Sequence, residues 1–77
     1  MIGKVKRAPH IAFGRNVCRL RTAARLTQEN LAEKAELSRR YVQEIEAGSK
    51  NPSVNTAVRL KLALACSWDE LFSQTEK

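Results

Sequence analysis

The chain has 77 residues, with fourteen lysines and arginines against eight aspartates and glutamates, for a formal charge of +6. This length allows one domain and leaves no room for a second catalytic or ligand-binding module. The basic balance favours a polyanionic partner, either nucleic acid or an anionic membrane surface, and seven of the basic residues precede the first acidic one, Glu29.

The N-terminal segment, residues 1–9 (MIGKVKRAP), combines glycine, proline and three positive charges and is expected to be a flexible basic arm. Regular structure should begin after it, because the residue before Pro9 is steered away from helix. From His10 to about Ala24 the spacing of apolar residues is close to helical, with arginines on the remaining face. The apolar positions of this first predicted helix are Ile11, Phe13, Val17, Leu20 and Ala24.

Two short helices follow, each preceded by a hydroxyl residue that can cap it. Thr27 offers an N-cap to a helix over 28–35, and Ser38 offers one to a helix that runs to about Ala47. Only about three residues separate these helices, so they must cross steeply, as in a helix-turn-helix. Gly48 is well placed to end the second of them in a left-handed conformation. Their inward positions are Leu31, Ala32 and Ala35, then Val42 and Ile45.

The remaining chain predicts a turn and two more helices. GSKNPS, residues 48–53, is a turn by composition. Ser53 can cap a fourth helix, and Ser67 a fifth, with Glu70 completing a capping box. Core candidates in these helices are Val54, Ala57, Val58, Leu60, Leu64, Trp68, Leu71 and Phe72. No strand pattern occurs, so the expected fold is all-α, with five short helices in a domain over 10–73 and a short tail over 74–77.

These residues also match a known family. LTQENLAEKAELSRRYVQEIEAG, residues 26–48, resembles the helix-turn-helix of the Cro and lambda-type repressor (XRE-like) family, and NPS, SWDELF and FGRNV resemble other segments of it. The resemblance covers roughly residues 12–72. It implies a lambda repressor-like DNA-binding domain, and a sequence-specific regulator of transcription that reads the major groove of double-stranded DNA as a homodimer on an inverted repeat, as a repressor or controller.

The resemblance places the recognition helix after Ser38. Candidates for base contact are Arg39, Arg40, Tyr41, Gln43 and Glu44. Candidates for contact with the DNA backbone are Thr27, Gln28, Ser38, Lys50, Asn51, Ser53 and Asn55. The forked donors of arginine match the two acceptors of guanine in the major groove, whereas a solvated basic face or phosphate contact would carry no sequence information.

Several of these positions have a second interpretation. Glu44 can accept a hydrogen bond from cytosine, or hold Arg40 as an i, i+4 neighbour. Tyr41 can pack on a thymine methyl or contact a phosphate, or be a half-buried aromatic that covers the helix-turn-helix. The loop residues can grip phosphate, or serve the turn alone. Arg21 and Glu46 match a pair that bridges two helices in the family, which is a structural role.

The chain departs from the family pattern at a few positions. Glu36, Arg25 and Ala65 stand where glycine is frequent at helix ends, so either these turns differ locally or they are strained. Leu62 replaces a residue that is usually polar, and Lys61 one that is usually small and apolar. This indicates either a shifted fourth helix or an apolar patch used for association. Candidates for a dimer interface are Leu62 and Trp68.

Other classes of function find little support. His10 is the one histidine, and no nucleophile–base pair, metal-ligand cluster or cofactor motif can be built, so we expect no enzyme, metal, cofactor or small-molecule ligand. Cys18 and Cys66 have no metal or redox spacing and are expected to be buried apolar residues. No apolar run is long enough to span a membrane, so a cytoplasmic, bacterial or phage protein associated with the nucleoid is expected. The alternative is a protein-interaction module, such as an antitoxin or adaptor.

Overall fold

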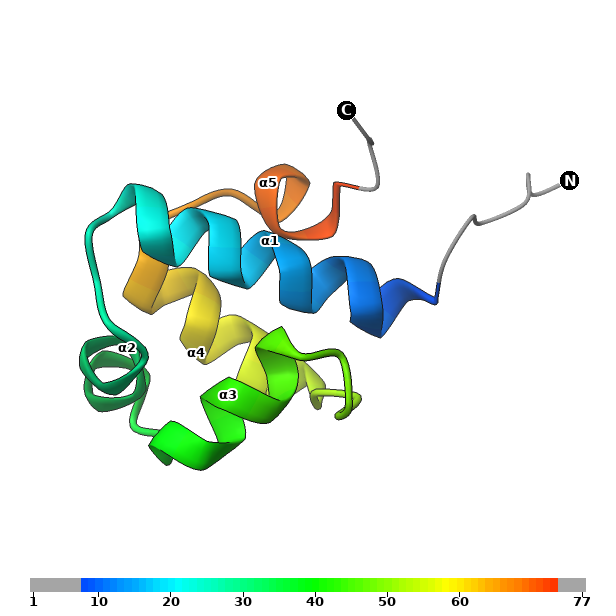
Figure 1. Cartoon of the computed structure of the whole chain (residues 1–77). Helices are drawn as coiled ribbons and strands as arrows, with labels where there is room; N and C mark the ends of the chain where they lie inside the picture. The colour runs from blue at the N-terminus through cyan, green and yellow to red at the C-terminus, as the bar shows by residue number, and fades with distance from the viewer. Residues whose placement is uncertain (1–7, 74–77) are drawn as a thin grey trace, which may run out of the picture.

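The computed structural model describes residues 8–73, so the tail over 74–77 and most of the predicted basic arm lie outside the described residues. Within residues 8–73 the chain forms helices and loops and no strand, which confirms the predicted all-α class. Figure 1 shows the order of the helices, which are α1 (Pro9–Ala23), α2 (Gln28–Ala35), α3 (Arg39–Glu46), α4 (Val54–Leu64) and α5 (Trp68–Phe72).

Hydroxyl side chains set the first residue of four helices, as predicted. Each accepts a hydrogen bond from the backbone N–H three residues later, and so satisfies a donor that has no partner within the helix. These N-caps are Thr27, Ser38, Ser53 and Ser67. Oδ1 of Asn30 accepts a hydrogen bond from the backbone N–H of Thr27 and so completes a capping box that was not predicted from the sequence. Helix α1 begins instead with a proline, Pro9, in its first turn.

Three helix-to-loop junctions use a left-handed residue that is not glycine. The φ angles of Arg25, Glu36 and Ala65 are 61°, 59° and 52°. The family-like turns are therefore kept, and the chain accepts the strain, which is roughly 1–2 kcal/mol per residue for a side chain in this conformation. Gly48, with φ 78°, ends the turn after α3 without that cost, as predicted.

The core lies between the five helices, each of which contributes at least one buried apolar side chain. Its largest fully buried side chains are Phe13, Val17, Leu31, Val42, Ile45, Leu60 and Leu71. Helices α1 and α3 approach closely, because a Cβ atom at Gly14 would overlap the carbonyl oxygen of Ile45. Gly14, which the sequence analysis did not single out, therefore fixes how deeply α3 is seated against α1.

Five residues predicted to be apolar core positions are exposed, among them Trp68, which is 41% exposed at the start of α5. Val54 and Val58 are 81% and 36% exposed, because the register of α4 turns Thr56, Ala57 and Leu60 inward and leaves the valines on the outer face. Ala24 is exposed because it lies just past the end of α1. Phe72 is 49% exposed although its ring contacts Phe13, at 5.1 Å between centroids.

The two cysteines are half-buried rather than fully buried. Burial raises the pKa of the Cys66 thiol, and the nearby Glu70 carboxylate adds to the effect. A raised pKa lowers the fraction of reactive thiolate at neutral pH, so the environment of Cys66 is that of a packing residue.

Candidate nucleic-acid interface

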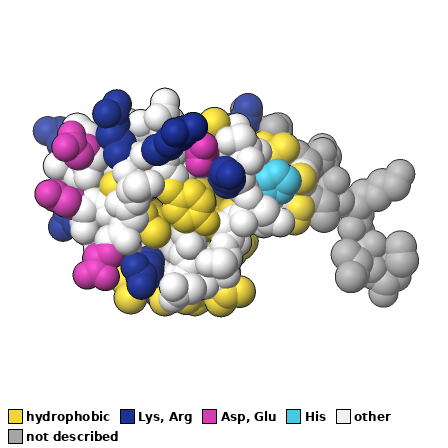
Figure 2. Space-filling model, turned by 90° about the horizontal axis from the view of Figure 1, so that it is seen from below, with side chains coloured by type: hydrophobic (Ala, Val, Ile, Leu, Met, Phe, Trp, Pro, Cys, Tyr) yellow, Lys and Arg dark blue, Asp and Glu magenta, His cyan; other side chains and the backbone are white. Residues whose placement is uncertain are grey.

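Helix α3 presents one face to the core and the other to solvent. Val42 and Ile45 are fully buried, whereas Arg39, Arg40 and Gln43 are exposed. Helices α2 and α3 and the loop after α3 lie along the lower side of the molecule in Figure 1. Figure 2 shows this side, on which separate lysine and arginine side chains lie among uncharged and hydrophobic ones, with most of the acidic side chains toward the α2 end. The exposed part of α3 is thus a row of hydrogen-bonding side chains on a surface free to meet another molecule.

Arg40 and Glu44 form an i, i+4 ion pair on this helix. The Nε of Arg40 lies 3.5 Å from Oε2 of Glu44, and the arginine side chain is 86% exposed. An ion pair this exposed is weak, so the guanidinium can leave it at little cost when a better acceptor is offered. Of the two roles considered for Glu44, the structure contains the one in which it orients Arg40.

Tyr41 is half-buried and packs against the hydrophobic core. Its backbone N–H donates to Oγ of Ser38 at 3.0 Å, in the N-cap of α3. The ring therefore covers the helix-turn-helix from outside, which is the structural role considered for it.

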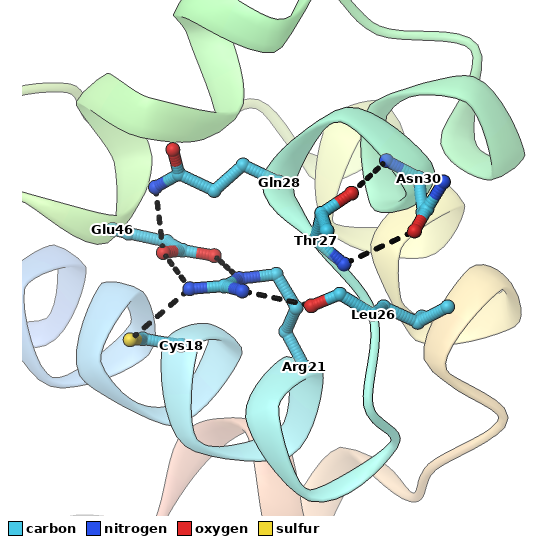
Figure 3. A network of polar contacts seen from close by, with 7 residues as sticks. All are labelled: Cys18, Arg21, Leu26, Thr27, Gln28, Asn30 and Glu46. Atoms are coloured by element: carbon cyan, nitrogen blue, oxygen red, sulfur yellow. Dashed lines mark hydrogen bonds and ion pairs between the residues drawn. The ribbon is translucent and has the colours of Figure 1, made fainter.

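A partly buried polar network holds α3 against α1 and α2 (Figure 3). Arg21 Nε lies 2.7 Å from Oε2 of Glu46, and Arg21 Nη2 donates to Oε1 at 3.1 Å. Arg21 also donates to the carbonyl of Leu26 at 2.8 Å, and Gln28 donates from Nε2 to Oε1 of Glu46 at 3.0 Å. The predicted pairing of Arg21 with Glu46 is confirmed. The hydrogen bond to the Glu46 carboxylate raises the pKa of Arg21, so its charge is permanent.

This network gives Gln28 a defined position. Its side chain bridges the first residue of α2 to the last residue of α3. The family resemblance implies two roles for Gln28, contact with a phosphate and bracing of the recognition helix, and this hydrogen bond is the bracing contact. The sequence did not identify Glu46 as the group that orients the amide, because that contact spans 18 positions of the sequence.

The other candidates for backbone contact divide into caps and loop residues. Thr27, Ser38 and Ser53 each use the hydroxyl oxygen to accept the N-cap hydrogen bond. A hydroxyl that accepts in this way keeps its own proton as a donor, and Ser53 donates this proton to Oγ1 of Thr56 at 3.1 Å. The remaining candidates, Lys50, Asn51 and Asn55, are exposed. The loop that carries the first two is closed by Ser49, whose backbone N–H and hydroxyl both donate to the carbonyl of Glu44.

Residues 8–73 contain no group of three or more histidine, cysteine, aspartate or glutamate side chains that would hold a metal ion. Nor does any helix among them have the length and apolar character needed to cross a membrane.

Comparisons with known proteins point to one family. Residues 19–71 match the helix-turn-helix family. An uncharacterised HTH-type transcriptional regulator of Sinorhizobium fredii is 38% identical over 64 residues, which are 83% of this chain and 83% of that protein. Control protein C.MunI of a Mycoplasma species is 35% identical over 68 residues, covering 87% of this chain and 92% of that protein. The crystal structure of the restriction-modification controller protein C.AhdI from Aeromonas hydrophila matches with a TM-score of 0.80 at 39% identity, covering 86% of this chain and 100% of that one.

Proposed function

The chain belongs to the helix-turn-helix family, and from this premise we propose that it is a sequence-specific DNA-binding regulator of transcription, acting as a repressor or controller. One observation carries the proposal. Helix α3 is anchored by Val42 and Ile45 and braced by Glu46, while its exposed arginines face solvent on an open surface. An anchored helix with exposed forked donors is what base recognition in the major groove requires.

In this proposal α3 lies in the major groove and its first turn reads base edges. Arg39 and Arg40 bind guanine through its two acceptors, a contact worth on the order of 1–3 kcal/mol of discrimination. Gln43 and Glu44 lie one turn further along the same helix and contact the next bases. Tyr41 contributes at the edge of the groove through its exposed rim.

Phosphate contacts surround this helix. Lys50, Asn51 and Asn55 contact the backbone from the loop and the start of α4, and Gln28 contacts it from the start of α2. The cap hydroxyls of Thr27 and Ser38 donate their protons to phosphate oxygens, and Ser53 contacts the backbone from the start of α4. The basic arm, residues 1–9, adds charge beside the domain over 10–73. These contacts fix the register of α3 and carry no base information themselves.

We further propose that the protein binds as a homodimer to an inverted repeat. One recognition helix reads only half a site, and paired helices of this class occupy half-sites about one turn, ~34 Å, apart. Leu62 and Trp68, which are 70% and 41% exposed, are the proposed interface residues. The protein would work without enzymatic activity of its own, in the cytoplasm of a bacterium or an infected cell, on the nucleoid.

The exposed apolar side chains of α4 and α5 favour one second candidate, a protein-interaction module such as an antitoxin or adaptor. The two candidates differ in a selection from a random duplex library at near-physiological salt. The regulator enriches an inverted repeat with half-sites about one turn apart. Binding that is weakened by salt but enriches no sequence would contradict the proposed function and favour the second candidate.

A further inference from the structure

An apolar stripe runs along the outer face of α4. Val54, Val58 and Leu62 follow one another at intervals of four residues, which places them on one side of the helix. They are 81%, 36% and 70% exposed. At 1.5 Å per residue, Val54 and Leu62 lie about 6 Å on either side of Val58 along the helix axis. The stripe is therefore almost symmetric about its middle residue.

A cavity of about 210 Å³ opens beside one end of this stripe. It lies between the start of α1, the loop before α4 and the end of α5, and its apolar lining includes Phe13, Pro52, Ala57 and Phe72. Val54, the first residue of the stripe, is part of the same lining. An apolar protein cavity of about 150 Å³ is large enough to bind benzene, so this one has room for a leucine side chain.

The cations of α4 leave the stripe uncharged. Arg59 donates to the carbonyl of Glu36 at 3.2 Å, and its Nη1 lies 3.7 Å from the carboxylate of the same residue. Lys61 lies over the ring of Trp68, 5.5 Å from its centroid. Both side chains are thus turned toward partners within the chain. Two copies of this face can meet without bringing unpaired like charges together.

From these observations we infer that two copies of the chain pack their α4 helices antiparallel about Val58, and that each inserts Leu62 into the cavity beside the partner's Val54. If a two-fold axis passes beside Val58, Leu62 of one copy faces Val54 of the other. This follows because both residues lie about 6 Å from the axis, measured along the helix. The stripe and the cavity are then complementary parts of one isologous interface. This inference deepens the proposed function and rests on its dimeric form.

The same arrangement links assembly to DNA contact. Asn51 and Ser53, two of the residues proposed to contact phosphate, form the polar wall of this cavity. Filling the cavity therefore restrains the loop that would grip the DNA backbone. Since coupling between two binding events is reciprocal, a phosphate held by this loop should in turn strengthen the dimer.

Disulfide trapping without DNA tests this geometry. In a background that carries Cys18→Ala and Cys66→Ser, Leu62→Cys protein is mixed with His10→Cys protein, since His10 lines the cavity. A disulfide needs Cα atoms about 4.4–6.8 Å apart, so the mixed pair should cross-link under mild oxidation, and Val58→Cys should cross-link with itself. Glu33→Cys, exposed on α2, is the control partner for Leu62→Cys and should not react above background.

Sedimentation of the wild-type protein and of alanine variants supplies the second readout. Leu62→Ala should raise the dissociation constant of the dimer at least about tenfold. Each of the two copies loses the leucine side chain that fills the cavity of the other. Thr22→Ala, exposed on α1, should leave it unchanged. A monomeric wild-type chain, or equal cross-linking of Leu62→Cys to positions 10 and 33, overturns the inference. Cross-linking as expected, together with no selected DNA sequence, would instead uphold the interface and contradict the regulator.

Discussion

The ion pair between Arg21 and Glu46 is the clearest single-residue test of the fold. The glutamate side chain is 6% exposed and accepts hydrogen bonds from both Arg21 and Gln28. Glu46→Ala leaves a partly buried guanidinium without its counter-charge, so it should lower the free energy of unfolding by about 2 kcal/mol in urea titrations. A loss below about 1 kcal/mol, the value of an exposed pair, would show that the network contributes little.

The left-handed turns provide a second test at the residue scale. Ala65 has φ 52°, where alanine is strained and glycine is not. Ala65→Gly should raise the free energy of unfolding by about 0.5–1 kcal/mol, since relief of strain exceeds the extra entropy of the unfolded chain.

The matched control is the same change two residues earlier. Ala63 lies inside α4, where glycine costs about 1 kcal/mol of helix stability, so Ala63→Gly should shift the thermal midpoint in the opposite direction. If both substitutions destabilise the protein equally, the conformation of Ala65 in solution differs from the one described.

Single residues also mark the limit of sequence reasoning. The absence of glycine at positions 25, 36 and 65 is visible in the sequence, but only the structure decides between a local change of turn and retained strain. The bond from Gln28 to Glu46 links segments distant in the sequence and leaves no periodic pattern. The resemblance to a family placed Gln28 at the site without giving its partner.

At the scale of elements, α5 depends on one buried side chain of α1. Asn16 is 8% exposed and donates to the carbonyls of Leu71 and Ser73, both at 2.7 Å, so it satisfies the end of a helix only five residues long. Asn16→Ala should cost about 1–3 kcal/mol and loosen α5 before the rest of the domain unfolds.

Trp68, the one tryptophan of the chain, lies at the start of α5 and reports this loosening. In the Asn16→Ala variant its fluorescence should change at lower urea concentration than the far-ultraviolet circular dichroism does. Coincident transitions would mean that α5 unfolds together with the whole domain and that Asn16 has no special hold on it.

The loop after α3 should act through charge alone. Lys50 is exposed beside the recognition helix, and Lys50→Ala removes one cation without touching the core. If this side chain contacts a phosphate, the variant should bind all duplexes more weakly by a similar factor, and the slope of log K against log salt should fall by about one. A loss confined to one sequence would place Lys50 at a base instead.

The residue at which each helix starts was more predictable from the sequence than the face that each helix turns inward. Hydroxyl caps defined the starts of α2 to α5 because a cap is a local interaction between residues three apart. The inward face of α4 was assigned wrongly at Val54 and Val58, since an apolar residue has the same pattern whether it meets the core or a partner. Thr56 decides the register, because it is buried with its hydroxyl bonded to Ser53.

At the scale of the whole molecule, two surfaces share one scaffold. Helix α1 contacts α3 through Gly14 and α5 through Asn16, so it connects the proposed DNA-binding face with the apolar surface of α4 and α5. The recognition helix can therefore be held at a fixed distance from its copy across a dimer. An inverted repeat of defined spacing is the expected consequence.

Parallel selection from one random duplex library tests this account most directly. The wild-type protein and the Arg39→Ala and Arg40→Ala variants are selected side by side at the same salt concentration. We expect all three to enrich an inverted repeat of the same spacing, and each variant to lose preference at one base pair in both half-sites, where a guanine stands in the wild-type sequence. Identical enriched sequences from all three proteins, or no enrichment by the wild type, would contradict recognition of DNA by α3.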